Sequence, residues 1–163
     1  MQTYKVFPAV ITAVLALAPA QAQAQFGGPK VATVTAVAKP STVARGGKGV
    51  LLVTVSVGPQ YHINANKPND PAYIPTAFSG QAAPGIIFGA AKYPAARSVK
   101  VSYSPKPLLV YTGKAVIAVP YMVTKSAKLG KMALAGTVSF QGCDAKSCYP
   151  PASAPVRAVI TIK

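Results

Sequence analysis

The sequence predicts an all-β domain, because apolar and polar side chains alternate along several segments rich in Val, Ile and Thr. Clusters of Pro, Gly, Asn and Ser separate these segments, and no convincing amphipathic helix is found. The mature chain of about 140 residues has the usual size of one domain and can bury a core without a disulfide. Short strands at regular spacing in such a domain favour an immunoglobulin-like β-sandwich.

Five segments carry the alternation. In chain order, 30–38 (KVATVTAVA) is rich in Val and Thr, and 49–57 (GVLLVTVSV) places alternate Leu and Val side chains on one face. The segments 114–123 (KAVIAVPYMV), 131–140 (KMALAGTVSF) and 154–162 (APVRAVITI) alternate in the same way. The part of the chain between the second and third segments holds short extended pieces joined by Pro-rich loops. We therefore expect five long strands and several short ones.

The first 24 residues predict an export signal rather than part of the fold. Lys5 precedes the apolar run VFPAVITAVLALA, which is too short to span a membrane, and the small residues of PAQAQA follow it. Cleavage after Ala22 or Ala24 fits this pattern and leaves residues 25–163 as the exported domain. No later segment is apolar for long enough to predict a transmembrane helix.

The charge of the chain is strongly unbalanced. Seventeen Lys and Arg residues face two acids, Asp70 and Asp144, which gives a formal net charge of +15. The cations are scattered along the sequence without a run of five, a pattern typical of a solvated basic surface. A nucleic-acid interface would need a clustered basic face with aromatic residues, so we expect no nucleic-acid partner. An acidic protein or an anionic membrane surface is compatible with the charge.

Both cysteines of the chain, Cys143 and Cys148, lie in SFQGCDAKSCYPP, between two predicted strands. Four intervening residues allow a disulfide, and disulfides persist in exported proteins. Closing a loop of about six residues stabilises a domain by only roughly 2 kcal/mol. Lys146 would favour a thiolate and Asp144 would oppose it. On these residues alone, both a structural disulfide and a redox couple stay open.

The small number of possible ligands disfavours a metal site. The chain has one histidine, His62, beside its two cysteines. A structural zinc site takes four ligands, and a blue-copper site takes two histidines and one cysteine. We therefore expect no bound metal.

Three stretches extend the argument: YHINANKPNDPAYIPT (61–76), LLVYTGKAVIAVPYMV (108–123) and GTVSFQGCDAKSCYPP (136–151). Together they resemble the N-terminal periplasmic domain family of the thiol:disulfide interchange protein DsbD, and the resemblance covers most of residues 31–163. The last stretch is similar to the family's active-site hairpin. It is the most specific of the three, because a cysteine pair, a preceding strand and trailing prolines must all coincide.

The resemblance implies an immunoglobulin-like β-sandwich with an inserted active-site segment. It also implies a periplasmic thiol–disulfide exchange domain, with an association with cytochrome c biogenesis. Such a domain passes reducing equivalents between thioredoxin-like carriers through mixed disulfides, and acts as a protein-disulfide reductase or as a component of one. Carried onto this chain, Cys148 would form the mixed disulfide and Cys143 would resolve it. No metal, flavin or nucleotide cofactor is implied.

The resemblance also implies partners. These are thioredoxin-like periplasmic proteins and, because the membrane domain and the C-terminal thioredoxin-like domain of the family's full-length protein are missing here, a membrane thiol transporter on another chain. We therefore expect a stand-alone version of the domain. The competing hypothesis is an exported immunoglobulin-like binding or structural module whose disulfide is only a staple.

In the family a short cap loop shields the cysteine pair with an aromatic side chain. The matching region here is 107–113 (PLLVYTG), so the resemblance makes Leu109, Val110 or Tyr111 the expected cap. Family members often carry acidic residues near the cap, whereas this region has none.

Three further residues are candidates near the cysteine pair. His62 and Asn64 occupy positions of the facing strand where the family has tyrosines. With an unperturbed pKa of about 6.5, His62 can transfer a proton to or from a leaving thiolate; the alternative is a polar strand residue without a chemical role. Tyr149 is expected to line the site by packing.

Overall fold

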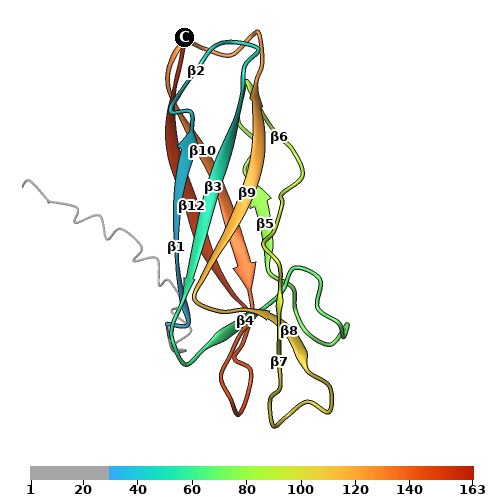
Figure 1. Ribbon diagram of the computed structural model, residues 1–163. Coiled ribbons are helices and arrows are strands. Elements are labelled where there is room, and N and C mark those ends of the chain that lie inside the picture. Colours follow the sequence, from blue (N-terminus) through green and yellow to red (C-terminus); the bar gives the residue numbers. More distant parts are fainter. Residues whose placement is uncertain (1–29) are drawn as a thin grey trace, which may run out of the picture.

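The computed structural model describes residues 30–163, and this part of the chain contains twelve strands and no helix. Figure 1 shows a long sandwich with a smaller sheet at one end. The predicted export signal, residues 1–24, lies outside the described residues. Among the described residues, no helix is long and apolar enough to cross a membrane.

Two four-stranded sheets form the sandwich. The first sheet has the order β1 (Ala32–Lys39), β3 (Lys48–Val57), β9 (Lys114–Val123), β6 (Ile86–Phe88). The second sheet has the order β2 (Thr42–Val43), β12 (Ala152–Ile162), β10 (Gly130–Phe140), β5 (Ala77–Gly80). Neighbouring strands are antiparallel except β2 and β12, which are parallel. The predicted all-β, immunoglobulin-like sandwich is confirmed, and each of the five predicted long strands is present within two residues of its expected bounds.

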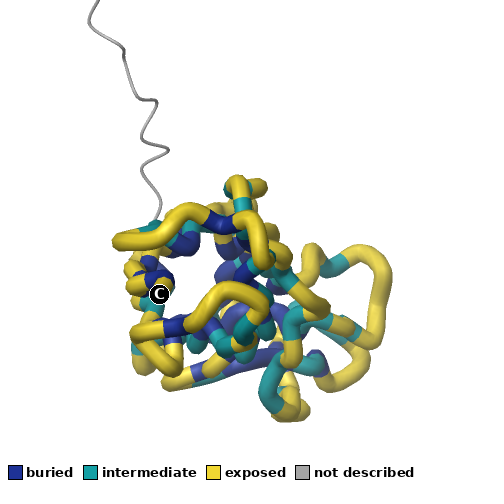
Figure 2. Tube along the Cα trace, turned by 90° about the horizontal axis from the view of Figure 1, so that it is seen from above, coloured by how far each residue is buried: buried dark blue, intermediate teal, exposed yellow. Residues whose placement is uncertain are grey.

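The core lies between the two sheets, where the alternating apolar side chains meet. In β3, Leu51, Val53 and Val55 are fully buried while the residues between them are partly exposed. Ile117 of β9 and Ile160 of β12 are buried in the same cluster. Figure 2 shows these buried positions gathered inside, with exposed positions around them. Each fully buried side chain of this kind contributes about 1.5–3 kcal/mol, which is why the alternation in the sequence determines the strand register.

A third sheet contains β11 (Gly142–Cys143) and therefore the first of the two cysteines. It has the order β11, β4 (His62–Asn64), β8 (Leu108–Tyr111), β7 (Arg97–Val99), and all its pairs are antiparallel. β11 follows β10 after one residue, and β4 follows β3 after a short turn, so the third sheet continues from the end of the sandwich. A second, smaller core of Val101, Leu108 and Val110 supports it.

Candidate functional site

Cys143 and Cys148 form a disulfide at this end of the molecule. Cys143 is the last residue of β11 and pairs with His62 of β4. Cys148 faces it across an antiparallel bridge, and their Cα atoms are 3.9 Å apart. This distance is slightly shorter than the usual disulfide range and is close to that of directly opposed residues in a non-hydrogen-bonded antiparallel pair. The two cysteines therefore close a tight hairpin, as predicted from their spacing.

A glycine permits the chain to approach the sandwich at this point. A Cβ atom on Gly142 would lie 2.6 Å from a methyl carbon of Val31, closer than two such atoms can come. Gly142 is itself buried, and its carbonyl accepts a hydrogen bond from the Tyr149 amide at 2.8 Å. The residue before Cys143 must consequently be small for β11 to pack against Val31, the residue just before β1.

The two sulfur-bearing residues differ in exposure. Cys143 is fully buried, with a relative exposure of 0%, whereas Cys148 is partly exposed. A thiol-disulfide exchange reaction begins with attack at a sulfur that a second thiolate can reach. Cys148 is the member of the pair that a partner can reach first.

Asp144 organises the loop between the cysteines. Its Oδ1 atom accepts hydrogen bonds from the amides of Lys146 at 2.7 Å and Ser147 at 2.9 Å, which is the pattern of an Asx turn. Its own amide donates to the Ser147 carbonyl at 2.9 Å. These bonds hold the four-residue loop in one shape and set the direction in which Cys148 leaves it.

The second carboxylate oxygen of Asp144 accepts a hydrogen bond from the Tyr149 hydroxyl at 2.6 Å. This hydrogen bond, together with the amides of Lys146 and Ser147, lowers the pKa of Asp144 from 3.8 to about 2. The same bond raises the pKa of Tyr149 from 10.0 to about 12. The Tyr149 ring also lies edge-on to Tyr61, with centroids 6.1 Å apart. Tyr149 thus lines the loop, and its hydroxyl takes part in the electrostatics of the site.

The Asp144–Tyr149 pair predicts a specific titration. In Asp144→Asn, we expect the pKa of Tyr149 to fall from about 12 toward its ordinary 10.0, because the charged acceptor is gone. The folded-state pKa of Asp144 is depressed, so the pair stabilises the loop above pH 3.8 and loses that effect as the pH falls through about 2. Tyr149 has a raised pKa, so its contribution is complete below pH 10.0 and is lost as the pH rises through about 12.

Tyrosinate absorbance measures this titration. The chain has eight tyrosines, so the Tyr149 signal is obtained by subtracting the profile of Tyr149→Phe. Asp70→Asn is the matched control, since it removes the same charge from a carboxylate whose hydrogen-bond partner is the Ala72 amide. An equal shift of Tyr149 in both variants would show that the effect is general charge and not the 2.6 Å hydrogen bond.

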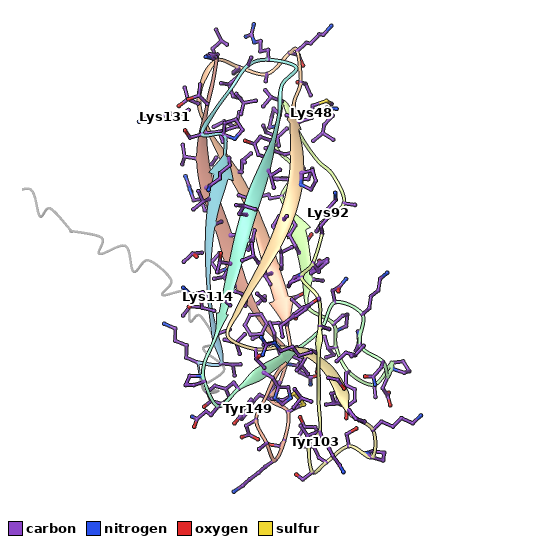
Figure 3. The ribbon with its side chains drawn as sticks, in the orientation of Figure 1. Lys48, Lys92, Tyr103, Lys114, Lys131 and Tyr149 are labelled. Carbon is purple, nitrogen blue, oxygen red and sulfur yellow. A yellow bond between two sulfur atoms is a disulfide. The ribbon has the colours of Figure 1, made fainter. Side chains whose placement is uncertain are left out.

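A tyrosine from another loop reaches the exposed sulfur. Tyr103 lies in residues 100–107, which join β7 to β8, and its hydroxyl is 3.6 Å from Cys148 Sγ. The same hydroxyl is 3.1 Å from His62 Nε2. A disulfide sulfur carries no proton, so Tyr103 is the donor when it bonds to Cys148, and His62 is then the donor to the Tyr103 oxygen. Figure 3 shows Tyr103 and Tyr149 at the same end of the molecule.

The pKa values in this group follow from burial. The pKa of His62 is lowered from 6.5, because desolvation outweighs the attraction of Asp144. His62 is therefore neutral near pH 7 and can accept a proton. The pKa of Tyr103 is raised above 10.0 by desolvation and by the nearby Tyr73 and Asp144, so Tyr103 keeps its hydroxyl proton across the physiological range.

The predicted cap residues lie elsewhere. Leu109, Val110 and Tyr111 belong to β8, so the region expected to form a cap loop contains a paired strand of the third sheet. Val110 is fully buried, and the Tyr111 hydroxyl donates to Asn66 at 2.8 Å instead of facing the sulfurs. The aromatic side chain whose hydroxyl lies 3.6 Å from Cys148 Sγ, Tyr103, comes from the loop that precedes β8.

Asn64 has a supporting place in the site. It is 1% exposed, and its Nδ2 atom donates to the Ile74 carbonyl and to Gln141 Oε1, both at 3.1 Å. Gln141, which the sequence did not single out, also donates from Nε2 to the Tyr149 carbonyl at 3.2 Å. Asn64 therefore fixes the residues around the cysteine hairpin, and no hydrogen bond joins it to either sulfur among the described contacts.

An apolar groove borders the cysteine hairpin. It has a volume of about 250 Å³, and its lining includes Val31, Phe140, Tyr149, Pro150 and Pro151. The two prolines that follow Cys148 thus form part of a surface beside the reachable sulfur. Within residues 30–163, no group of three or more His, Cys, Asp or Glu side chains is placed to hold a metal ion.

The geometry agrees with the comparisons with known proteins. A sequence model described as thiol:disulfide interchange protein DsbD, N-terminal, matches residues 29–159. A search of curated proteins finds no match.

Three solved structures are similar to this chain, each at low identity. The reduced DsbD N-terminal domain of Neisseria meningitidis has 18% identity and a TM-score of 0.43, covering 66% of this chain and 74% of that one. The N-terminal periplasmic domain of ScsB from Proteus mirabilis has 14% identity and a TM-score of 0.48, covering 76% of this chain and 43% of that one. The seventh ScaB type I cohesin of Pseudobacteroides cellulosolvens has 12% identity and a TM-score of 0.41, covering 80% and 92%.

The family match is the comparison that assigns the chain. It extends over nearly all of the part that the structure describes and includes both cysteines. This chain belongs to the family of N-terminal domains of the thiol:disulfide interchange protein DsbD.

Proposed function

We propose that this chain is a periplasmic exchange domain that passes reducing equivalents between thioredoxin-like carriers through Cys143 and Cys148. The observation that carries the proposal is the unequal burial of the pair. Cys148 is partly exposed beside Tyr103, and Cys143 is fully buried behind it. A structural staple does not require this asymmetry, whereas an exchange site needs one sulfur for the partner and one for resolution.

The reaction balances with the two cysteines alone. In the reduced domain, the Cys148 thiolate attacks one sulfur of a carrier's disulfide and forms a mixed disulfide, while the carrier's other cysteine leaves as a thiolate that takes up a proton. The Cys143 thiolate then attacks the Cys148 sulfur and releases the second carrier thiolate, which is also protonated. The carrier gains two electrons and two protons, and the Cys143–Cys148 disulfide forms again.

Tyr103 and His62 support the step at Cys148. When the domain is reduced, the Tyr103 hydroxyl, 3.6 Å from the sulfur, can donate to the thiolate and stabilise its charge. When Cys148 is a thiol and donates to the Tyr103 oxygen, the Tyr103 hydroxyl can donate to Nε2 of the other His62 tautomer. His62, neutral near pH 7 and 3.1 Å from this hydroxyl, can then receive the thiol proton through Tyr103. Through these contacts, the Cys148 thiolate can form and be stabilised although the expected cap region has no acidic residue.

We propose that the cover of the site is the loop 100–107, with Tyr103 as its shielding side chain. The loop must move aside when a carrier docks. Ser102, Ser104 and Pro105 flank Tyr103 in the sequence, while Val101 holds the start of the loop in the small core. The carriers would be thioredoxin-like periplasmic proteins, and the source of electrons would be a membrane thiol transporter. The exchange requires no metal, flavin or nucleotide, because the thiols themselves carry the electron pair.

A redox titration tests this function. In glutathione or dithiothreitol buffers, we expect the Cys143–Cys148 pair to titrate as a two-electron couple with a potential above about −300 mV. A reduced thioredoxin-like protein should reduce the pair stoichiometrically. A potential below about −300 mV, with no reduction by such a protein, would instead support an exported immunoglobulin-like binding or structural module.

A further inference from the structure

The end of the sandwich opposite the disulfide carries a concentrated positive charge. Seven exposed cations lie there, on strand ends and connecting loops, and are here called the basic pole: Lys39, Arg45, Lys48, Lys125, Lys128, Lys131 and Lys163. In Figure 3, Lys48 and Lys131 mark this end, and Tyr103 and Tyr149 mark the other. Because β10 and β12 have eleven residues each, the two ends are roughly 35 Å apart.

Backbone contacts fix the loops of the basic pole to one another. The Arg45 amide donates to the Lys163 carbonyl at 3.0 Å, and the Lys163 amide donates to the Val43 carbonyl at 3.1 Å. Arg45 Nε donates to the Ala127 carbonyl at 2.7 Å, which connects this corner to the loop between β9 and β10. The charges, which are scattered in the sequence, are therefore collected by the fold on one surface.

No acidic side chain compensates them. The two acids of the chain, Asp70 and Asp144, both lie at the disulfide end, in the loop after β4 and between the cysteines. A surface with this excess attracts an anionic partner over about one Debye length, which is about 8 Å at physiological salt.

The residue types indicate what kind of anion fits. All but one of the cations are lysines, which act as point charges and do not require the bidentate geometry that arginine forms with a fixed carboxylate. Leu129 lies at the tip of the loop between β9 and β10, between Lys128 and Lys131, and is 62% exposed. An exposed apolar side chain surrounded by lysines matches the boundary between lipid headgroups and acyl chains.

We propose that the basic pole binds the surface of an anionic phospholipid bilayer, with Leu129 entering the headgroup region. The bound domain would hold its disulfide end roughly 35 Å from the bilayer, facing away from it. An acidic protein is the other class of partner. It fits less well because these lysines stand on strand ends and loop tips, where the cations project outward. The inference does not depend on the proposed exchange function.

Vesicle sedimentation tests the charge component. We expect the protein to bind vesicles of phosphatidylglycerol mixed with phosphatidylcholine and not vesicles of phosphatidylcholine alone. Binding should be lost near 1 M salt, where the Debye length is about 3 Å. The variant K125Q/K128Q/K131Q should lower the affinity at least about tenfold, since each lysine near an anionic surface contributes to the attraction.

The control variant is K67Q/K100Q/K106Q, which removes the same charge from three exposed lysines in loops at the disulfide end. It should bind nearly as well as the wild type. Equal losses in both variants would show a general effect of net charge and would overturn the proposal. Absence of vesicle binding, with retention on immobilised polyglutamate, would also overturn it in favour of an acidic protein partner.

A tryptophan reporter tests the orientation. The chain has no tryptophan, so Leu129→Trp introduces a single one at the loop tip. We expect its emission to shift to shorter wavelength on addition of the anionic vesicles. Val116→Trp, on an exposed position near the start of β9, should not shift. A shift of the second reporter without the first would place another face on the bilayer and overturn the proposal.

Discussion

Replacing Cys143 with serine is expected to trap a thioredoxin-like carrier on Cys148 as a stable mixed disulfide. Without the buried resolving thiol, the intermediate has no intramolecular route to completion. The reverse change, Cys148→Ser, should trap nothing, because the remaining sulfur has 0% relative exposure. Each variant should lose steady-state exchange entirely. Non-reducing electrophoresis of a periplasmic extract, with mass spectrometry of the trapped band, makes the comparison.

A folding control is needed for the first of these variants. A serine hydroxyl at the fully buried position 143 lacks an evident partner, and burying such a group costs about 1–3 kcal/mol. Cys143→Ala removes the thiol without that cost and should trap the same carrier. Circular dichroism should show that both variants keep the β-sheet signal. Equal trapping by Cys143→Ala and Cys148→Ser would contradict the assigned roles, because it would mean that either sulfur can meet a partner.

The sandwich could be predicted because its strands are long and have one buried face each. β3 and β9 alternate buried and exposed residues over ten positions, and this pattern is written directly in the sequence. The third sheet gives no such signal. All three residues of β4 are buried, and β8 reads as four consecutive apolar or aromatic residues without alternation. Strands this short are recognised only from the neighbours that pair with them.

The candidate site was predictable where its residues lie close together in the sequence. The cysteine hairpin is local, since both residues and the intervening Asx turn fall within six positions. His62 also lies at the hairpin, as the resemblance implied, because it pairs with Cys143. Tyr103 is 45 residues from Cys148, and only the folding of the loop 100–107 over the hairpin brings the two together. The resemblance makes Leu109, Val110 or Tyr111 of the next strand the expected cap, although the loop just before that strand holds an aromatic residue as well.

Tyr103 can affect the reactivity of Cys148 in two ways. Its ring occupies space above a partly exposed sulfur, which limits the approach of any reagent. Its hydroxyl bonds to the sulfur and to His62, which changes the free-energy difference between thiol and thiolate. The first effect sets how fast a thiolate reacts once formed, and the second sets the pH at which it forms. Substitutions that remove the ring or only the hydroxyl can therefore distinguish shielding from electrostatics.

Tyr103→Ala is accordingly expected to raise the rate at which the Cys148 thiolate reacts with a small alkylating reagent at high pH. Tyr103→Phe should leave that rate unchanged and make Cys148 react more slowly at neutral pH. A hydrogen bond to a charged group contributes about 1.5–3 kcal/mol, so loss of the hydroxyl should move the midpoint of the alkylation profile to higher pH by about one to two units. In Tyr103→Phe the plateau rate at high pH should be unchanged. In Tyr103→Ala the midpoint should move similarly and the plateau should rise several-fold.

The rate of iodoacetamide labelling of Cys148 against pH, in a Cys143→Ala background, measures both quantities. Tyr73→Phe is the matched control, since Tyr73 packs against the same small core as Tyr103 but makes no hydrogen bond to either sulfur among the described contacts. It should leave midpoint and plateau unchanged. An unchanged plateau in Tyr103→Ala would mean that the ring does not cover Cys148, and an unchanged midpoint in Tyr103→Phe would mean that the 3.6 Å contact has no electrostatic effect on the thiolate.

Because His62 bonds to the same hydroxyl, His62→Gln should shift only the midpoint, and by less than Tyr103→Phe, if His62 acts on Cys148 through Tyr103.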